Sequence, residues 1–510
     1  MKGTKRFLPL LAVIPVGCIP QTSLTQKTAE KPNVVFIYAD DLGYGDVGCN
    51  GSQTIKTPHI DKLASQGIRF TNMHSAAATC TPSRYALLTG EYAWRRQGTG
   101  IATGDAGSII RPERFTLADV FKQAGYSTGA IGKWHLGLGD KTGMQDWNGH
   151  ITPGPSDIGF DYSFILAATG DRVPCVYLEN ERVVNLDPND PISVSYEKNF
   201  DGQPTGKENP ELLTMHPSHG HDMSIVNGIS RIGFMKGGKS AHWVDEEIAG
   251  VITGKAVEFI EKQKDKPFFL YFATQDIHVP RVPHPRFAGK SGMGPRGDAI
   301  IEFDWSVGEI VKTIRKLGLD KNTIIVISSD NGPVVDDGYK DQAVELLGNH
   351  KPAGPLRGGK YSSFEGGTRV PGLLRWTGTL NPDVSDKLIC QVDMIATFAD
   401  MLKVKVPAGV APDSENHLHT WLNQGGNGRE YLVLQNAANN LSIENGQWKF
   451  IAPGKGVALN NNTNTETGNL DKDQLYDLSA DLGEKVNVAE NHPEIVEKLR
   501  GKLEEIKAKK

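Results

Sequence analysis

The sequence predicts an α/β fold in which a large mixed, mostly parallel sheet is sandwiched by helices, with a small C-terminal α+β subdomain. Three observations lead to this prediction. Unbroken apolar runs, such as residues 33–38, are typical of strands buried on both faces of a parallel sheet. These runs alternate with segments of helical spacing. Several runs end in polar turns, and open α/β sheets bind ligands at that place.

The N-terminal half contains the first part of the alternation. Its expected elements are a strand at 33–38, a short helix leading into a strand over 59–70, a helix at 115–124 and a strand at 127–131. Residues 139–243 are rich in Pro, Gly, Asn and Asp and have few periodic runs. We therefore expect an insertion there, lying over one face of the sheet and shaping the mouth of a pocket.

Regular structure resumes in the C-terminal half. The expected elements are a helix at 244–263, a strand at 267–273, a helix at about 298–317 and a strand at 323–328. Beyond Gly425, runs at 431–435 and 448–451 indicate a small antiparallel sheet on which a helix at 494–507 packs. The mature chain is thus expected to divide into a main domain, 31–424, and a C-terminal subdomain, 425–510.

The composition limits the classes of function. The hydrophobic share of 38% and the charged share of 23% suit a soluble globular protein, and 510 residues exceed the usual size of one core. A net charge of −5 argues against general binding to nucleic acid or to a membrane surface. The five cysteines have no C-x-x-C spacing, which argues against a disulfide framework or a thiolate zinc site.

The first 20 residues have the pattern of an export signal. A basic start is followed by an apolar run, 7–16, that is too short to span a bilayer. Two outcomes stay open: simple cleavage, giving a periplasmic or secreted protein, and lipidation at Cys18, giving an outer-membrane lipoprotein. Pro15 stands where lipidation sites usually carry leucine. No later segment has the length and apolar character of a transmembrane helix.

Polar side chains follow four of the predicted strands. They are Asp40 and Asp41, Lys133 and His135, His278, and Asp330 with Asn331. Adjacent carboxylates repel each other unless a cation lies between them, and the hard divalent cations calcium and magnesium take such oxygen ligands. Each cluster taken singly also suits an ordinary turn. Their joint occurrence favours one site at the edge of the sheet.

The stretch from Cys80 to Gly90 reads Cys-Thr-Pro-Ser-Arg-Tyr-Ala-Leu-Leu-Thr-Gly. This C-x-P-S-R segment with its trailing Thr-Gly resembles the signature of the formylglycine-dependent sulfatases, the type I, arylsulfatase-like family of the alkaline-phosphatase-like superfamily. The resemblance extends from Asn33 to about Asn487. It implies the alkaline-phosphatase-like fold and hydrolysis of sulfate esters. A thiol alone is a poor acceptor of a sulfuryl group.

The resemblance also implies cofactors and a partner. In the family the signature cysteine is oxidised to formylglycine (3-oxoalanine), whose hydrate attacks sulfur, so Cys80 would need a formylglycine-generating or anaerobic sulfatase-maturating enzyme. The metal ligands of the family fall on Asp40, Asp41, Asp330 and Asn331, with the formylglycine from Cys80 completing the shell. The implied ion is Ca²⁺.

Further residues match catalytic positions of the family. Arg84 would hold the hydrate, Lys133 would bridge the hydrate and the sulfate, His135 would deprotonate the second hydroxyl, and Lys360 would bind sulfate. His278 resembles the general acid that protonates the leaving alcohol. Ile277 precedes it where the family often has proline, so His284 is an alternative. We favour His278 because it directly follows a strand.

The substrate is less well specified. An acid beside an arginine, as in Asp171-Arg172, suits recognition of a sugar, although a local surface pair explains it equally well. With Lys133, His278 and Lys360 this pair makes up the expected substrate-binding set. Export and resemblance together indicate sulfated glycans, with galactose or N-acetylgalactosamine sulfates as a first hypothesis. Three imidazoles at 216, 219 and 221 favour a loop or a substrate subsite over a zinc site.

Three functions are therefore weighed. The first is an exported calcium- and formylglycine-dependent sulfatase acting on carbohydrates. The second is a phosphodiesterase or phosphonate monoester hydrolase of the same superfamily. The third is a non-catalytic glycan-binding protein, which predicts retained binding after Cys80→Ala and no hydrolysis by the parent protein.

Overall fold

The computed structural model describes residues 1–5 and 31–509. Pro32–Lys510 forms one compact unit, which contains every element discussed below. Most of the expected leader, 1–20, including Cys18, lies outside the described residues, so the export signal stays a prediction. Within the described part of the chain, no helix is both long and apolar enough to cross a membrane.

A mixed sheet of ten strands, ordered β15-β2-β14-β13-β1-β12-β4-β5-β6-β7, forms the centre of this unit. The strands are β1 (Asn33–Ala39), β2 (Ile68–Phe70), β4 (Ser127–Lys133), β5 (Tyr162–Leu166), β6 (Tyr177–Glu179), β7 (Arg182–Val183), β12 (Phe268–Ala273), β13 (Thr323–Ser329), β14 (Gly372–Trp376) and β15 (Asp383–Ser385). The five strands from β13 to β5 are parallel, with Val35 paired to Leu270 and Ile325. The central strands are the predicted apolar runs, and β1 is buried throughout.

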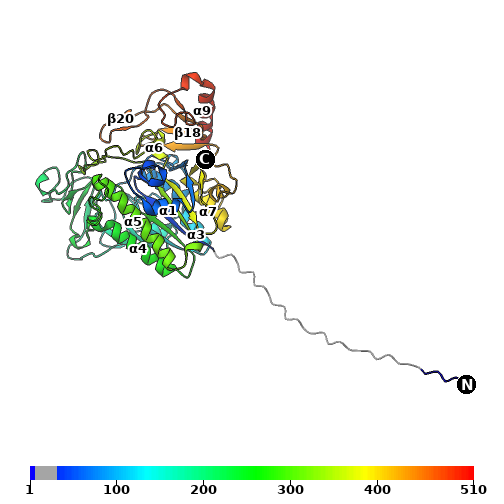
Figure 1. Ribbon diagram of the computed structural model, residues 1–510. Helices are drawn as coiled ribbons and strands as arrows, with labels where there is room; N and C mark the ends of the chain where they lie inside the picture. The colour runs from blue at the N-terminus through cyan, green and yellow to red at the C-terminus, as the bar shows by residue number, and fades with distance from the viewer. Residues whose placement is uncertain (6–30, 510) are drawn as a thin grey trace. The chain divides into compact units, whose positions relative to one another are not determined.

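Two groups of helices pack on this sheet (Figure 1). One group is α1 (Pro58–Ala64), α4 (Ile248–Gln263) and α5 (Gly294–Lys316), and the other is α2 (Cys80–Thr89), α3 (Leu117–Gln123) and α7 (Met394–Leu402). Both α4 and α3 contact β4 and β12, so the sheet lies between the two groups. The short helices α6 (Glu365–Thr368) and α8 (Leu418–Trp421) lie later in the chain. The predicted fold class, a mixed sheet sandwiched by helices, is confirmed.

Two elements differ from the sequence-based expectation. Helix α5 begins at Gly294 rather than near 298, because Pro295 occupies its first turn, where proline needs no donor partner. The stretch 139–243 is not irregular throughout, since β5, β6 and β7 extend the main sheet. The rest of that stretch contains short 3-10 helices and the short strands β8 (Ser193–Ser195), β9 (Ile225–Val226), β10 (Ile229–Ser230) and β11 (Phe234–Lys236).

The C-terminal part of the chain forms the expected antiparallel sheet, ordered β17-β18-β19-β22. Its strands are β17 (Leu432–Gln435), β18 (Leu441–Glu444), β19 (Trp448–Ile451) and β22 (Gln474–Asp477), and α9 (Pro493–Ala508) packs on β18 and β19. Shorter pairs are β3 (Met73–His74) with β16 (Ile389–Cys390) and β20 (Leu459–Asn460) with β21 (Thr465–Glu466). A buried ion pair, Lys449 Nζ to Glu365 Oε1 at 2.8 Å, joins this sheet to α6. The boundary at 424/425 stays a prediction.

Candidate active site

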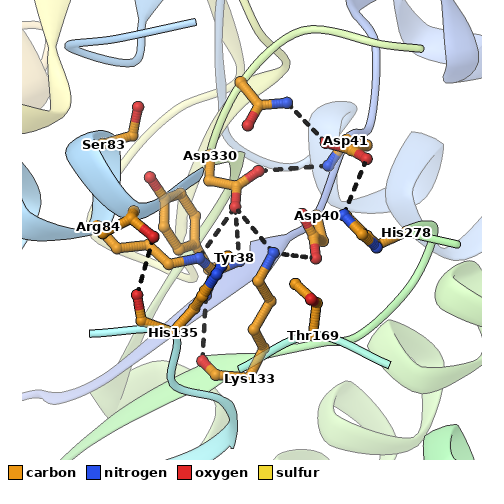
Figure 2. A network of polar contacts seen from close by, with 12 residues as sticks. Tyr38, Asp40, Asp41, Ser83, Arg84, Lys133, His135, Thr169, His278 and Asp330 are labelled. Carbon is orange, nitrogen blue, oxygen red and sulfur yellow. Dashed lines mark hydrogen bonds and ion pairs between the residues drawn. The ribbon is translucent and has the colours of Figure 1, made fainter. Parts of the chain in front are cut away.

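Four strand ends meet at one edge of the central sheet, as expected for parallel strands. Asp40 and Asp41 follow β1, and Asp330 and Asn331 follow the neighbouring β13, with all four side chains fully buried. The Asp41 backbone N–H donates to Asp330 Oδ1 at 3.3 Å, and Asn331 Nδ2 donates to Asp41 Oδ1 at 2.7 Å. Figure 2 shows the side chains of Asp40, Asp41 and Asp330 gathered at this point. The predicted metal ligands therefore lie together.

The donor set of this cluster suits a hard divalent cation. Asp40 Oδ1 and Asn331 Oδ1 are buried acceptors without a hydrogen-bond donor. Burial, and then the charge of Asp330, raises the pKa of Asp40 well above its ordinary value. Ligand atoms of Asp40, Asp41 and His278 all lie within 4.8 Å of one another. A cation at this point would satisfy the two orphaned oxygens and offset the repulsion between the carboxylates.

Cys80 occupies the first position of α2 and is buried. Burial raises the pKa of its thiol. Thr81, the next residue, donates from Oγ1 to the His135 carbonyl at 3.0 Å, and the Ala78 carbonyl accepts from the Tyr361 N–H at 2.8 Å, so Cys80 lies beside the segments that carry Lys133 and Lys360. One turn further along α2, Arg84 donates through Nε and Nη2 to Asp330 Oδ2 at 2.9 and 2.7 Å. An unmodified Cys80 is thus a neutral thiol and a weak nucleophile.

Two buried lysines supply positive charge around the carboxylates. Lys133, the last residue of β4, donates to Asp40 Oδ2 and lies 3.8 Å from Asp330 Oδ2. Lys360 donates to Asp41 Oδ2 at 2.8 Å. Because both ammonium groups are almost completely buried, their charges are little screened by water. The carboxylates of Asp40, Asp41, Asp330 and Asp337 balance the charges of these lysines and Arg84, so an anionic ligand would be favoured once a divalent cation is bound.

His135 has the hydrogen-bond pattern of a base. Its Nε2–H donates to the Ala102 carbonyl at 2.9 Å, whereas its Nδ1 is buried without a partner. Burial, followed by the charge of Lys133, lowers the pKa of His135 well below its ordinary value. The ring is therefore neutral at pH 7 with a free lone pair on Nδ1.

The two candidates for the general acid are separated in space. The Nδ1–H of His278 donates to the Val279 carbonyl at 2.7 Å, and its Nε2 lies 3.8 Å from Asp41 Oδ2. His284 instead faces Glu247, with Nε2 3.5 Å from Oε1, and its side chain is 30% exposed. The structure therefore brings His278 to the cluster, while His284 pairs with Glu247.

Asp171 and Arg172 form an ion pair in which the acid is buried and the arginine is partly buried. Asp171 is 2% exposed, and Arg172 Nη1 donates to its carboxylate at 2.8 Å. His221 and His219 face different carboxylates. His221 Nε2 lies 2.9 Å from Asp171 Oδ2, and His219 Nδ1 lies 3.9 Å from Asp336 Oδ1. The His-rich segment thus supplies a hydrogen-bond partner for Asp171, and its role as a substrate subsite stays a prediction.

Sequence reasoning missed Asp337. This residue is 7% exposed, and its Oδ2 accepts from Lys360 Nζ at 2.8 Å while its Oδ1 accepts from Tyr361 Oη at 2.8 Å. It lies in an irregular segment after Asp330-Asn331-Gly332, and no motif marks it. A sequence signal was absent because the position depends on contacts between distant loops.

Known proteins are similar to this chain over most of its length. The family model described as Sulfatase matches residues 32–404. An N-acetylgalactosamine-6-O-sulfatase from Bacteroides thetaiotaomicron is 54% identical over 512 residues, which cover 100% of both chains. Human arylsulfatase A is 29% identical over 92% of this chain and 87% of its own length.

Solved structures give a similar result. A structure described under the metabolism of multiple glycosaminoglycans by Bacteroides thetaiotaomicron has a TM-score of 0.93 and 55% identity, covering 94% of this chain and all of that one. A phosphonate monoester hydrolase of Agrobacterium radiobacter has a TM-score of 0.55 at 17% identity, over 94% of this chain and 96% of its own. The second likeness concerns the fold alone.

Proposed function

The chain belongs to the sulfatase family and is a sulfuric ester hydrolase, and we propose that it removes the 6-O-sulfate from N-acetylgalactosamine units of sulfated glycans. The observation that carries the proposal is the convergence at one edge of the sheet of the acidic cluster, two buried lysines and helix α2, which begins at Cys80 and is tied to Asp330 through Arg84. The full-length relative at 54% identity supports this choice of sugar and position.

We propose that Cys80 is oxidised to formylglycine by a maturation enzyme. The hydrated aldehyde supplies an oxygen nucleophile toward sulfur and a second hydroxyl through which the sulfate is later released. Neighbouring residues of the chain prepare this position. Arg84, fixed by two bonds to Asp330, holds positive charge one helical turn from residue 80, and Lys133, held on Asp40, is assigned to donate to a sulfate oxygen. His135, whose buried Nδ1 has no partner, is assigned to accept a proton from residue 80.

The residues that would hold Ca²⁺ are Asp40, Asp41, Asp330 and Asn331, together with the modified residue 80. When bound, the ion supplies positive charge to a sulfate oxygen. Lys360 adds an ammonium on the Asp41 side of the cluster, where it stabilises the charge of the sulfate. His278 donates a proton to the leaving sugar oxygen, and the anionic sulfate of the substrate favours its protonated form.

The metal part of the proposal predicts a thermal shift. Metal-stripped protein should gain stability on addition of calcium, by about 2.7 kcal/mol at a concentration one hundred times the Kd. The reason is that the cation satisfies Asp40 Oδ1 and Asn331 Oδ1 only in the folded chain. Differential scanning calorimetry with and without CaCl₂ measures the gain. Asp40→Asn should lose it, whereas the exposed Asp265→Asn should retain it. A parent melting temperature indifferent to calcium and magnesium contradicts the metal assignment.

The substrate part is tested with a panel of sulfated sugars. We expect 6-sulfated N-acetylgalactosamine to be hydrolysed roughly 10- to 150-fold faster, in kcat/KM, than 6-sulfated N-acetylglucosamine. The two sugars differ in the orientation of one hydroxyl, and we assign recognition of the orientation found in N-acetylgalactosamine to the charged pair Asp171–Arg172. Faster release from 4-sulfated N-acetylgalactosamine would refute the assigned position. Faster turnover of a phosphodiester would favour the phosphodiesterase alternative.

We also propose that the chain is exported, on the pattern of its first 20 residues. Cleavage of the leader and lipidation of Cys18 remain the two alternatives. An extracellular or periplasmic location suits a polymeric, charged substrate that does not cross a membrane unaided. The supporting pattern lies mostly outside the described residues.

A further inference from the structure

Asp337 is a buried carboxylate that has no role in the proposed reaction described above. Both of its oxygens are engaged, Oδ2 by Lys360 Nζ and Oδ1 by Tyr361 Oη, each at 2.8 Å. The His278 Nε2 lies 4.0 Å from the same Oδ2. Asp337 thus touches the expected sulfate-binding lysine and lies close to the expected general acid.

The contact with Asp337 limits how many N–H donors of Lys360 remain for a ligand. An ammonium group has three N–H donors. In Lys360 one donates to Asp41 Oδ2 and one to Asp337 Oδ2, so a single donor is left for a sulfate oxygen. A free lysine side chain carries about 2 kcal/mol of rotamer entropy. Two carboxylate partners remove that freedom and fix the direction of the third N–H.

The backbone around Asp337 is itself held in place. Residues 336–340 run antiparallel to residues 216–218, with Ser218 N–H donating to the Gly338 carbonyl and Lys340 N–H donating to the His216 carbonyl, both at 2.9 Å. Ser218 Oγ also donates to Asp336 Oδ1 at 2.6 Å. The segment that carries Asp337 is therefore attached to the insertion that carries His221.

Gly338 allows these two segments to approach each other closely. Gly338 has φ +118°, and a Cβ at this position would lie 2.1 Å from His221 Nδ1. The opposite ring nitrogen of His221 faces Asp171. Tyr361, in the left-handed region at φ 78°, is held by its hydroxyl on Asp337 and by its N–H on the Ala78 carbonyl at 2.8 Å. Asp337 is thus fixed between the Asp171–His221 pair and Lys360.

We propose that Asp337 is a positioning residue that directs the remaining N–H of Lys360 at the sulfate ester, with Tyr361 holding the Asp337 carboxylate in place. This inference rests on the proposed function in one respect, that Lys360 binds the sulfate. Asp337 itself acts through Lys360 and not on the reacting atoms. Its effect should therefore disappear when Lys360 can no longer bind sulfate.

A double-mutant cycle tests this dependence. The four proteins are the parent, Asp337→Asn, Lys360→Gln and the double variant, assayed on 6-sulfated N-acetylgalactosamine and with inorganic sulfate as competitive inhibitor. In the parent background, Asp337→Asn should lower kcat/KM about 30- to 100-fold and raise the Ki for sulfate about 10-fold, because the acceptor of the Lys360 ammonium loses its negative charge. In the Lys360→Gln background the same change should cost less than about 3-fold.

The outcomes distinguish a failure of the positioning role of Asp337 from a failure of the sulfate-binding role of Lys360. An equal loss in both backgrounds, or no loss in the parent, overturns the positioning role. A parent that releases sulfate while Lys360→Gln keeps full activity refutes the sulfate-binding role of Lys360, which belongs to the proposed function. If Asp337→Asn does not fold by circular dichroism, Tyr361→Phe takes its place: it removes one hydroxyl and should lower kcat/KM about 3- to 10-fold. Unchanged kinetics for Tyr361→Phe then overturn the proposal.

Discussion

Replacing Cys80 by alanine is expected to lower sulfate-ester hydrolysis by about 10⁴-fold or more, because the residue that bears the nucleophile is lost. The folded state should change little, since the substitution removes one buried sulfur atom that takes part in no disulfide. Sulfate release from the sugar substrate, together with the melting temperature, checks both statements.

Cys390 offers a matched control, because it too is buried and unpaired, on β16. Cys390→Ala should have a similar effect on stability and leave activity within about 2-fold. Mass spectrometry of the peptide bearing Cys80, from natively expressed enzyme, distinguishes an oxidised residue from a thiol. An unmodified thiol in fully active protein would contradict the formylglycine mechanism, and the raised pKa of the buried thiol makes direct attack by Cys80 a poor substitute.

The central part of this site could be predicted from sequence because it depends on one property of parallel sheets. Apolar runs buried on both faces identify β1, β4, β12 and β13, and the carboxyl ends of parallel strands meet at one edge. Asp40, Asp41 and Asp330 are therefore brought together by strand order, with no need to know the loops. Helix α2 adds Cys80 and Arg84 from a signature that is contiguous in sequence.

The positions of Asp337 and His221, which do not follow strands of the main sheet, could not be predicted in the same way. Asp337 and His221 are placed by a short antiparallel contact between two irregular segments more than 100 residues apart, at 216–218 and 336–340. Neither segment has a hydrophobic period from which pairing could be inferred. The main sheet also has more strands than the sequence predicts. β14 and β5 to β7 are short strands at its sides, and their apolar runs fall below a clear strand pattern.

The choice between His278 and His284 depended on structure as well. Both lie shortly after β12, and sequence spacing alone does not tell which ring turns toward the cluster. In the structure the Nδ1–H of His278 is fixed on the Val279 carbonyl, which leaves Nε2 on the side of Asp41 and Asp337. Burial, and next the charge of Lys360, lowers the pKa of His278 well below its ordinary value. A bound sulfate would offset that charge and favour the protonated ring.

His278→Ala should therefore slow hydrolysis most for substrates whose leaving oxygen needs a proton. For a sugar sulfate, whose leaving hydroxyl is a weak acid, we expect a loss of about 10²- to 10⁴-fold in kcat. For an activated aryl sulfate, whose phenolate leaves without protonation, we expect a loss below about 10-fold. His284→Ala is the matched control and should change both rates by less than about 2-fold, because its ring faces Glu247. Equal losses on the two substrates for His278→Ala would remove it from the acid role and leave it a residue that only binds substrate.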